Sequence, residues 1–359
     1  MSRTRLHPLT IAATRVLPDG VAITFYIPEE LAETFKHTPG QYLTVESIIQ
    51  GEKVRRSYSI CSYHQDATIE IGVKRIDSGL FSNHALTLRA GDTIDVLPPQ
   101  GRFTTEIDKH NQRHYLLIAA GSGITPCLSM AKSVLQDEPQ SHITLLYGNR
   151  SISSMMFKED LAALKDSHTD RFNIINMLSA ERQDVEIFNG RITGELLAQF
   201  ANSGLLPITE FHSAFLCGPL DMVNSVAETL ISLGLDKDQV YQELFTTESI
   251  GKTIKPTSAK VSENVHGQTV TVILDGARTE IKVDASQDTV LMAAQRAGID
   301  MPFSCAGGMC CTCRCKVLQG TTRMDANFSL AQWEIEAGYT LACQTRPESD
   351  GVILDFDAI

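Results

Sequence analysis

The spacing of a cysteine cluster constrains this chain more than any other feature of its sequence. Five of the nine cysteines lie between residues 305 and 315. Cys305, Cys310 and Cys313 have four and then two residues between them, and Cys343 follows at a distance. C-x4-C-x2-C with one remote cysteine is the spacing that holds a plant-type [2Fe–2S] cluster. The two glycines in the loop allow a tight turn with N–H groups directed at the sulfurs. We therefore predict these four cysteines to be the cluster ligands.

Other uses of the cysteines fit the sequence less well. Disulfides are not expected, because the first residues lack the pattern of a signal peptide and crowded cysteines then indicate metal or redox chemistry. Structural zinc prefers two C-x2-C pairs, and only Cys310 and Cys313 form one. Cys315 opens a predicted strand and is expected to be packed. Cys311 is expected beside the cluster, and an exchange of ligands with it stays open.

Length and charge exclude several classes of function. The 359 residues are enough for two or three domains. No apolar run approaches the ~20 residues that a membrane-spanning helix needs. The formal net charge of −12 disfavours nucleic acid or an anionic membrane as a partner. We expect a cytoplasmic protein.

The first 110 residues are predicted to form an antiparallel β-barrel. Residues 21–27 and 67–74 alternate apolar and polar side chains, and Asp19-Gly20 is one of several turn signals between such segments. Many short strands with regular turns are typical of a barrel or a sandwich.

Residues 111–246 are predicted to form an α/β domain with a parallel sheet. Tyr115–Ala120 reads as a buried strand, after which Gly121–Pro126 turns into a helix expected to begin near Cys127. Strands followed by helical stretches recur from residues 143, 172 and 214, which is a βαβαβ pattern.

The last part of the chain is predicted to be an α+β (β-grasp) ferredoxin domain over residues 268–359. Residues 247–267 lack a clear period and are interpreted as a linker. A hairpin around Asp275-Gly276, a helix at about residues 289–297 and the cysteine loop then follow in order.

Two short motifs in the first domain contain groups suited to a flavin nucleotide. In Arg56-x-Tyr58-Ser59, an arginine suits a phosphate, a tyrosine can pack against a planar ring, and a hydroxyl can reach a ring atom. Gly79-x-x-Ser82 precedes a short predicted helix, where a pyrophosphate could bind. A half-exposed strand and an ordinary helix N-cap are the alternatives.

Two motifs in the second domain follow strands of the same sheet. Gly121-Ser-Gly-Ile-Thr-Pro126 lies where a doubly wound sheet binds a dinucleotide, although it meets the G-x-G-x-x-G fingerprint only in part. Cys217-Gly-Pro-Leu-Asp-Met222 follows a later strand and is expected to form the other wall of the crevice. Either motif alone could be a simple turn.

Together these motifs resemble the ferredoxin–NADP reductase family. With a plant-type ferredoxin domain at the C-terminus, the chain is similar to the reductase components of multicomponent oxygenases. The chain resembles the reductase subunits of phenylacetyl-CoA epoxidases most closely. Segments that carry this resemblance include Arg-x-Tyr-Ser-Ile-Cys, Ala-Ala-Gly-Ser-Gly-Ile-Thr-Pro and the ending Val-x-Leu-Asp-Phe-Asp-Ala. Steroid-hydroxylase reductases share this architecture.

The resemblance implies roles for individual residues. It implies FAD, preferred to FMN on this ground alone, bound by Arg56, Tyr58, Ser59, Gly79 and Ser82. It implies a nicotinamide site formed by Gly121, Gly123, Thr125, Cys217, Gly218 and Met222. Glu243 and Phe245 match the family's Glu-x-Phe segment near the flavin ring. The residues expected nearest to hydride transfer are Tyr58, Ser59, Thr125, Cys217 and Glu243.

NADPH is expected rather than NADH. An adenosine 2′-phosphate needs cations and hydroxyls beyond the second and third strands. Arg150, Ser179 and Arg182 occupy those places, and no acidic residue directly follows the second strand.

Electron counting then gives the expected function. A nicotinamide delivers two electrons as hydride and a cluster accepts one at a time, so a flavin between them converts one mode to the other. The resemblance implies an oxygenase component as acceptor, most closely a di-iron epoxidase acting on phenylacetyl-CoA. A Rieske-type or steroid hydroxylase or a hybrid-cluster protein is the alternative, and a cluster-bearing sensor or binding module without reductase activity is a remote one.

Overall fold

The structure, a computed structural model, describes residues 5–244 and 267–358. These residues divide into two compact units, one that includes residues 7–54 and 58–244 and one that includes residues 267–358. The first unit contains a six-stranded and a five-stranded sheet, and the second a five-stranded sheet with a two-stranded ribbon. The predicted linker lies outside the described residues, apart from its last glycine. None of the helices described combines the length and apolar character of a membrane span.

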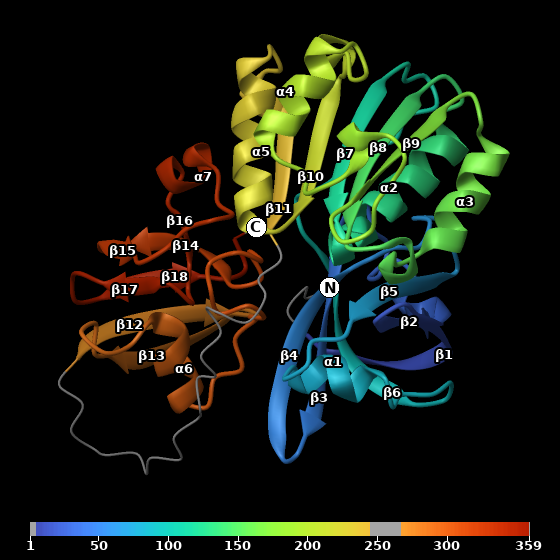
Figure 1. The fold of residues 1–359 in the computed structure, drawn as a ribbon. Coiled ribbons are helices and arrows are strands. Elements are labelled where there is room, and N and C mark those ends of the chain that lie inside the picture. The colour runs from blue at the N-terminus through green and yellow to red at the C-terminus, as the bar shows by residue number, and fades with distance from the viewer. Residues whose placement is uncertain (1–4, 245–266, 359) are drawn as a thin grey trace. The chain divides into compact units, whose positions relative to one another are not determined.

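The six-stranded sheet is the expected antiparallel barrel (Figure 1). Its strand order is β4-β3-β6-β1-β2-β5, and a bridge between Ile60 and Ile71 connects the two edge strands. Alternate side chains such as Leu9 and Ile23 point inward and are fully buried. Helix α1 (Leu80–Ala85) packs against β3 and β5. The strands are β1 (His7–Leu17), β2 (Gly20–Tyr26), β3 (Tyr42–Ile49), β4 (Glu52–Ser59), β5 (Thr68–Lys74) and β6 (Thr93–Gln100).

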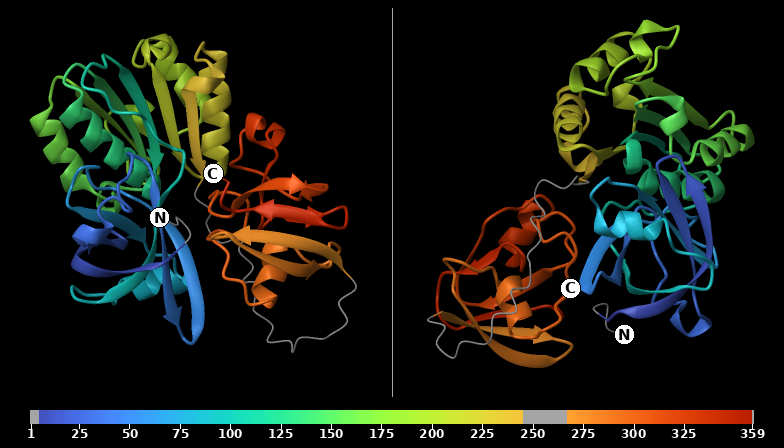
Figure 2. Two further views of the ribbon diagram at one scale, coloured as in Figure 1. Left: turned by 180° about the vertical axis from the view of Figure 1, so that it is seen from behind. Right: turned by 60° about the horizontal axis from the view of Figure 1, so that its bottom comes forward.

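The five-stranded sheet of the same unit is parallel throughout, as the βαβ rhythm predicts. Its order is β11-β10-β7-β8-β9. Figures 1 and 2 show α2 and α3 on one face and α4 and α5 on the other, and a separate apolar core lies under each pair. The elements are β7 (His114–Ala120), α2 (Ile124–Asp137), β8 (His142–Asn149), α3 (Lys158–Ser167), β9 (Phe172–Leu178), α4 (Gly194–Asn202), β10 (Ser213–Gly218), α5 (Leu220–Ser232) and β11 (Val240–Leu244).

The strand order reverses between β7 and β10. The chain leaves β7 toward β8 on one side, and β10 returns on the other side of β7. A crevice at the carboxyl ends of two such strands is where doubly wound sheets bind their ligands. Helix α2 begins there at Ile124, three residues before the predicted start near Cys127. Proline is tolerated in a first helical turn, where its missing N–H needs no partner, so Pro126 does not delay the helix.

The second unit has the predicted α+β fold. Its mixed sheet has the order β13-β12-β18-β14-β16, with β12 and β18 parallel, and α6 contributes buried residues to the core. The predicted hairpin and helix are observed within one or two residues. The elements are β12 (Gln268–Leu274), β13 (Ala277–Val283), α6 (Val290–Arg296), β14 (Arg314–Gln319), β15 (Thr322–Met324), α7 (Gln332–Glu336), β16 (Tyr339–Leu341), β17 (Thr345–Pro347) and β18 (Val352–Asp355).

Candidate functional site

The two glycine motifs of the parallel sheet lie directly against each other. A β-carbon placed on Gly123 would be 2.1 Å from the carbonyl oxygen of Cys217, so only glycine allows this approach. Gly121 has a φ of 55°, in the left-handed region that favours glycine. A β-carbon on Gly218 would be 2.6 Å from the Cε of Met222. The backbones of the two turns therefore lie against each other.

Three predicted site residues from three strands meet beside these turns. The Ser59 Oγ donates a hydrogen bond to Oε2 of Glu243 over 3.1 Å, and the Cys217 Sγ lies 4.0 Å from the same oxygen. Cys217 and Glu243 are also register partners in neighbouring strands. Burial raises the pKa of Glu243 to about 8, although the hydrogen bond from Ser59 opposes the shift. At neutral pH this carboxyl is therefore mostly protonated and can donate a hydrogen bond.

Thr125 connects the crevice to the barrel. Its side chain is buried, and its Oγ1 donates to the carbonyl of Ser122 over 2.9 Å. A β-carbon on Gly72 of β5 would lie 2.7 Å from the Thr125 Cγ2. The barrel backbone thus touches the first turn of α2, which fixes the flavin motifs relative to the nucleotide motifs.

The two predicted flavin motifs are in contact with each other. The ring of Tyr58 packs at 5.4 Å between centroids against Phe81, which lies inside the Gly79-x-x-Ser82 motif. The Ser82 hydroxyl is buried and accepts a hydrogen bond from the N–H of Ile76 over 3.1 Å. It therefore closes its own turn in this structure, while Tyr58 keeps a half-buried ring.

Two cations lie near these motifs. Arg56 is exposed on β4, and its Nη1 donates to the carbonyl of the preceding residue over 2.7 Å. The Nζ of Lys74, at the end of β5, would be 3.3 Å from a β-carbon on Gly121. Our sequence analysis missed Lys74 and Phe81. A basic residue at a strand end and an aromatic residue inside a glycine motif were the available signals.

In the second unit the cysteine loop directs backbone donors at one sulfur. The Sγ of Cys305 accepts N–H groups of Gly307, Met309 and Cys310 over 3.3–3.4 Å. A hydrogen bond from the Cys310 thiol and these backbone N–H groups lower the pKa of Cys305 below that of an ordinary thiol. Such a loop stabilises a thiolate, the form that binds iron.

The four predicted ligands form two close pairs. The thiols of Cys305 and Cys310 are in contact, and so are those of Cys313 and Cys343. Among the described residues, no three candidate ligands converge on the position of a single ion. Two pairs suit a cluster of two irons, each of which takes two cysteines. Cys315 lies on β14 and is fully buried in the core of the second unit, as expected for a packed residue.

Three family models match the chain, each over one of these folds. They are the oxidoreductase FAD-binding domain over residues 10–105, the oxidoreductase NAD-binding domain over residues 117–228 and the 2Fe-2S iron-sulfur cluster binding domain over residues 272–348. A protein of Escherichia coli (strain K12), named as one of the subunits of 1,2-phenylacetyl-CoA epoxidase, is 42% identical to the chain, and the match covers 99% of both proteins. The chain belongs to the ferredoxin–NADP reductase family.

A second relative and one solved structure match the chain over nearly its whole length. The ferredoxin reductase component of 3-ketosteroid-9-alpha-monooxygenase from Rhodococcus rhodochrous is 34% identical over 97% of the chain and 96% of the relative. The structure of phthalate dioxygenase reductase covers 98% of both chains with a TM-score of 0.56 at 20% identity, which is a likeness of fold. The expected fold, oxidoreductase class and cofactors FAD, NAD(P)H and [2Fe–2S] are thus confirmed. The domain boundaries and residue roles stay predictions.

In this reductase, the residues predicted for a 2′-phosphate lie at neighbouring loop ends. The N–H of Ser179 donates to the carbonyl of Asn149, and that of Ala180 donates to the carbonyl of Arg150. The loops that follow β8 and β9 are therefore joined side by side. The side chains of Arg150 and Ser179 are exposed there.

The same region contains an acidic residue that the sequence analysis did not weigh. Glu181 accepts the N–H of Ile152 over 2.8 Å, which ties its carboxylate to the turn that follows β8. Arg182 lies next to it, 3.4 Å from Glu186, and both of these side chains are more than four-fifths exposed at 86% and 81%. The ion pair of Arg182 with Glu186 is solvent-exposed and therefore weak.

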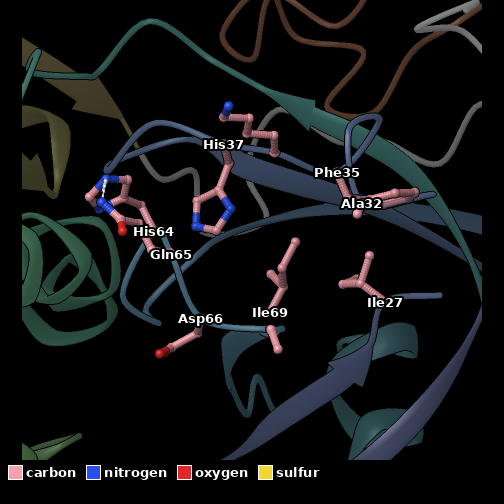
Figure 3. Close-up of a pocket in the computed structure, with 10 residues that line it drawn as sticks. Ile27, Ala32, Phe35, His37, His64, Gln65, Asp66 and Ile69 are labelled. Atoms are coloured by element: carbon pink, nitrogen blue, oxygen red, sulfur yellow. Dashed lines mark hydrogen bonds between the residues drawn. The ribbon is translucent and has the colours of Figure 1, made fainter. Parts of the chain in front are cut away.

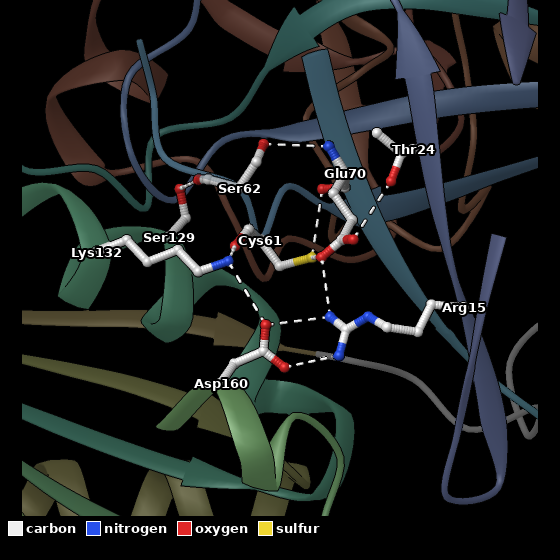
Figure 4. Close-up of polar contacts among 8 residues, drawn as sticks. All are labelled: Arg15, Thr24, Cys61, Ser62, Glu70, Ser129, Lys132 and Asp160. Atoms are coloured by element: carbon white, nitrogen blue, oxygen red, sulfur yellow. Dashed lines mark hydrogen bonds and ion pairs between the residues drawn. The ribbon is translucent and has the colours of Figure 1, made fainter. Parts of the chain in front are cut away.

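A cluster of polar side chains joins the barrel to the nucleotide domain within the first unit (Figure 4). Arg15 of β1 forms a two-pronged ion pair with Asp160 of α3, over 2.8 and 3.1 Å. From α2, Lys132 donates to the carbonyl of Cys61 over 2.9 Å, and Ser129 donates to the next carbonyl over 2.8 Å. We call Arg15, Cys61, Ser129, Lys132 and Asp160 the interdomain polar cluster. It lies on the same interface as Thr125.

A pocket of about 510 Å³ opens in the barrel, and none of the predicted site residues lines it (Figure 3). His37 is buried beside it, and its Nε2 has no hydrogen-bond partner among the described residues. Burial lowers the pKa of His37 to about 4, so the imidazole is neutral. The lining residues are Ile27, Ala32, Phe35, Lys36, His37, His64, Gln65, Asp66, Ala67 and Ile69. Phe245, the last predicted site residue, lies outside the described residues.

Proposed function

We propose that this reductase passes electrons from NADPH to the oxygenase component of a phenylacetyl-CoA epoxidase, a di-iron enzyme. The observation that carries the proposal is the meeting of Ser59 from the flavin motif with Cys217 and Glu243 from the nucleotide sheet. Full-length identity of 42% to the Escherichia coli protein supports the choice of partner.

The chain's residues have distinct tasks at the crevice. When bound, FAD accepts hydride from the nicotinamide and the cluster passes electrons on singly. Thr125 and Cys217 position the nicotinamide between the two glycine turns. Glu243 accepts the hydroxyl of Ser59 and, largely protonated at neutral pH, can donate a hydrogen bond toward the flavin ring. Burial raises the pKa of the Cys217 thiol, so this residue is a packing surface and not a nucleophile.

The barrel motifs hold the flavin. We assign the isoalloxazine to Tyr58 and Ser59, and a phosphate to Arg56. Gly79 and Ser82 shape the turn that receives the pyrophosphate. The Ser82 hydroxyl accepts the N–H of Ile76, so we assign Ser82 to holding the shape of this turn.

We prefer NADPH because two arginines and a hydroxyl lie on the loops that we assign to the adenosine end. Arg150, Ser179 and Arg182 lie on joined loops, and the exposed pair with Glu186 opens at little cost. Glu181 is engaged with the Ile152 N–H, which leaves it less able to accept the 2′-hydroxyl of NADH.

The cluster is held by the pairs Cys305–Cys310 and Cys313–Cys343. Backbone donors on the Cys305 sulfur stabilise charge on the ligand and tune the potential of the centre. Cys315 supports the core behind the loop.

Reconstitution with two oxygenase components tests the choice of partner. The purified reductase is combined with NADPH, phenylacetyl-CoA and the oxygenase component of phenylacetyl-CoA epoxidase, and consumption of O2 and NADPH is followed. We expect substrate-dependent turnover in this mixture and little in a parallel one with the oxygenase component of 3-ketosteroid-9-alpha-monooxygenase and a ketosteroid. The opposite result would favour the steroid system, for which the 34% identical relative is named.

A further inference from the structure

A fully buried tyrosine reaches the first glycine turn (residues 121–123) from the neighbouring strand. Tyr147 of β8 is 0% exposed and is the register partner of Ala119, which lies two residues before that turn in β7. Its hydroxyl donates to the carbonyl of Gly121 over 3.1 Å. The same carbonyl accepts the N–H of Ile124, the residue with which helix α2 begins. The Tyr147 hydroxyl therefore holds the carbonyl that joins the turn to the helix.

The same hydroxyl also contacts the segment that precedes helix α3. The carbonyl of Met156 lies 3.3 Å from it. A phenol has a single O–H proton, so the two carbonyls share one donor. Burial raises the pKa of Tyr147, so this proton stays on the hydroxyl at neutral pH. Tyr147 thus connects the first glycine turn to residues 156–157.

The residue after Met156 has an unfavourable backbone conformation. Phe157 has a φ of 57°, in the left-handed region that a bulky side chain rarely adopts. Its ring is fully buried against Gly72 of β5, where a β-carbon would be 2.8 Å from the Phe157 Cε2. The Cγ2 of Thr125 would be 2.7 Å from the same β-carbon. Phe157 and Thr125 therefore pack against one point of the barrel.

We propose that Tyr147 is a positioning residue for hydride transfer, an inference that rests on the nicotinamide site of the proposed function. It holds the first glycine turn directly, through the carbonyl of Gly121. It holds Thr125 indirectly, because the segment of Met156 and Phe157 packs beside that residue. Hydride transfer depends on the placement of the reacting atoms, and a misplacement of about 1 Å can cost roughly a hundredfold in rate.

The adenosine end of the nucleotide should not depend on this hydroxyl. The loops that we assign to that end have hydrogen bonds of their own. Glu181 accepts the N–H of Ile152, and the N–H of Ala180 donates to the carbonyl of Arg150. Neither bond involves Tyr147. Loss of the hydroxyl should therefore slow hydride transfer and leave binding of the adenosine half unchanged.

Tyr147→Phe in the holoenzyme tests this separation. We expect the limiting rate of FAD reduction by NADPH in stopped flow to fall roughly tenfold. The Kd for 2′,5′-ADP, an analogue of the adenosine end that has no nicotinamide, should equal that of wild type in calorimetry. A merely structural role would lower the free energy of unfolding without slowing FAD reduction.

Tyr115→Phe is the matched control. Tyr115 is also buried and belongs to the same apolar core, but its hydroxyl donates to the carboxylate of Glu138 over 3.1 Å. It is the second residue of β7, at the end of this strand that lies away from the turn. A hydrogen bond to a carboxylate is at least as strong as one to a carbonyl, so the control should lose as much stability as Tyr147→Phe. Its rate of FAD reduction should equal that of wild type.

Gly72→Ala is a second test, because its β-carbon would displace Phe157 and Thr125 while the Tyr147 hydroxyl stays in place. It should slow FAD reduction and leave the Kd for 2′,5′-ADP unchanged. If Tyr147→Phe fails to bind FAD, this variant decides the question, and a wild-type rate in it would overturn the proposal.

Three results for Tyr147→Phe would also overturn the proposal. They are a rate equal to that of wild type, a loss of rate no larger than in Tyr115→Phe, and a loss of 2′,5′-ADP binding as large as the loss of rate. Failure of NADPH to reduce FAD in the wild type would instead refute the proposed function itself.

Discussion

The cysteine loop and the nicotinamide crevice are built in opposite ways. Three of the four cluster ligands lie within nine residues, and the loop that contains them also supplies the N–H donors for Cys305. The crevice brings Ser59 to Glu243, which is 184 residues away, and takes Cys217 from a third strand. A local site is determined by spacing, whereas an assembled site depends on the register of strands and the contact between two domains.

The loss of the one remote ligand should have the largest effect. Cys343→Ser is expected to remove the cluster absorbance and to reduce electron delivery through the cluster to background. Reduction of FAD by NADPH should continue, because Ser59, Cys217 and Glu243 belong to the first unit and Cys343 to the second. Visible spectroscopy and stopped-flow reduction measure the two properties. Cys315→Ser is the matched control, since Cys315 is buried in the same core but outside the two thiol pairs. A normal [2Fe–2S] spectrum in Cys343→Ser would disprove the ligand assignment.

Arg182 tests how the assembled site selects its nucleotide. Arg182→Ala should raise the KM for NADPH by roughly tenfold, because a charge-assisted hydrogen bond to the 2′-phosphate is lost. The KM for NADH should change little. Glu186→Gln is the control, because it releases Arg182 from its exposed ion pair and should leave the KM for NADPH equal or lower. Equal losses for both nucleotides in Arg182→Ala would refute this role.

Glu243 gives the crevice a pH dependence. Its pKa of about 8 means that the carboxyl is protonated below that pH and ionises above it. The hydride-transfer rate of the wild type should therefore change around pH 8. Glu243→Gln imitates the protonated form, so it should match the wild type at pH 6.5 within about threefold and show no change at higher pH. Stopped-flow reduction of FAD between pH 6 and 9.5 measures this.

Ser59→Ala sharpens the same assignment. The hydrogen bond from Ser59 favours the ionised carboxylate, so its removal should move the pH at which the rate changes upward. An unaltered change near pH 8 in Glu243→Gln would mean that another group titrates.

The interdomain polar cluster should contribute least. Asp160→Asn breaks the pair with Arg15, whose side chain is 43% exposed, so the free energy of unfolding should fall by only about 1 kcal/mol. Urea denaturation measures the change. Asp77→Asn, in the exposed pair with Arg75, is the control and should change stability by less than about 0.5 kcal/mol. A loss in Asp160→Asn no larger than in this control would remove the cluster's role in holding the domains together.

Local patterns in the sequence were sufficient to predict the strands, the helices after them and the position of both glycine motifs. Patterns of this kind depend on neighbours in the chain, as the Cys305–Cys310 pair and the turn at Gly121 do. The contact of Gly72 with Thr125, the place of Lys74 beside Gly121 and the tie of Glu181 to Ile152 arise from packing between distant elements. No spacing encodes such contacts. Helix α2 begins three residues before the predicted start, because a first helical turn tolerates Pro126.

The visible spectrum before and after anaerobic addition of NADPH tests the central claim most directly. A reductase that binds both FAD and the [2Fe–2S] cluster should show flavin bands and cluster absorbance. Both absorbances should decrease when NADPH is added. A protein with cluster absorbance but no flavin bands, or one whose spectrum NADPH does not change, would contradict the account.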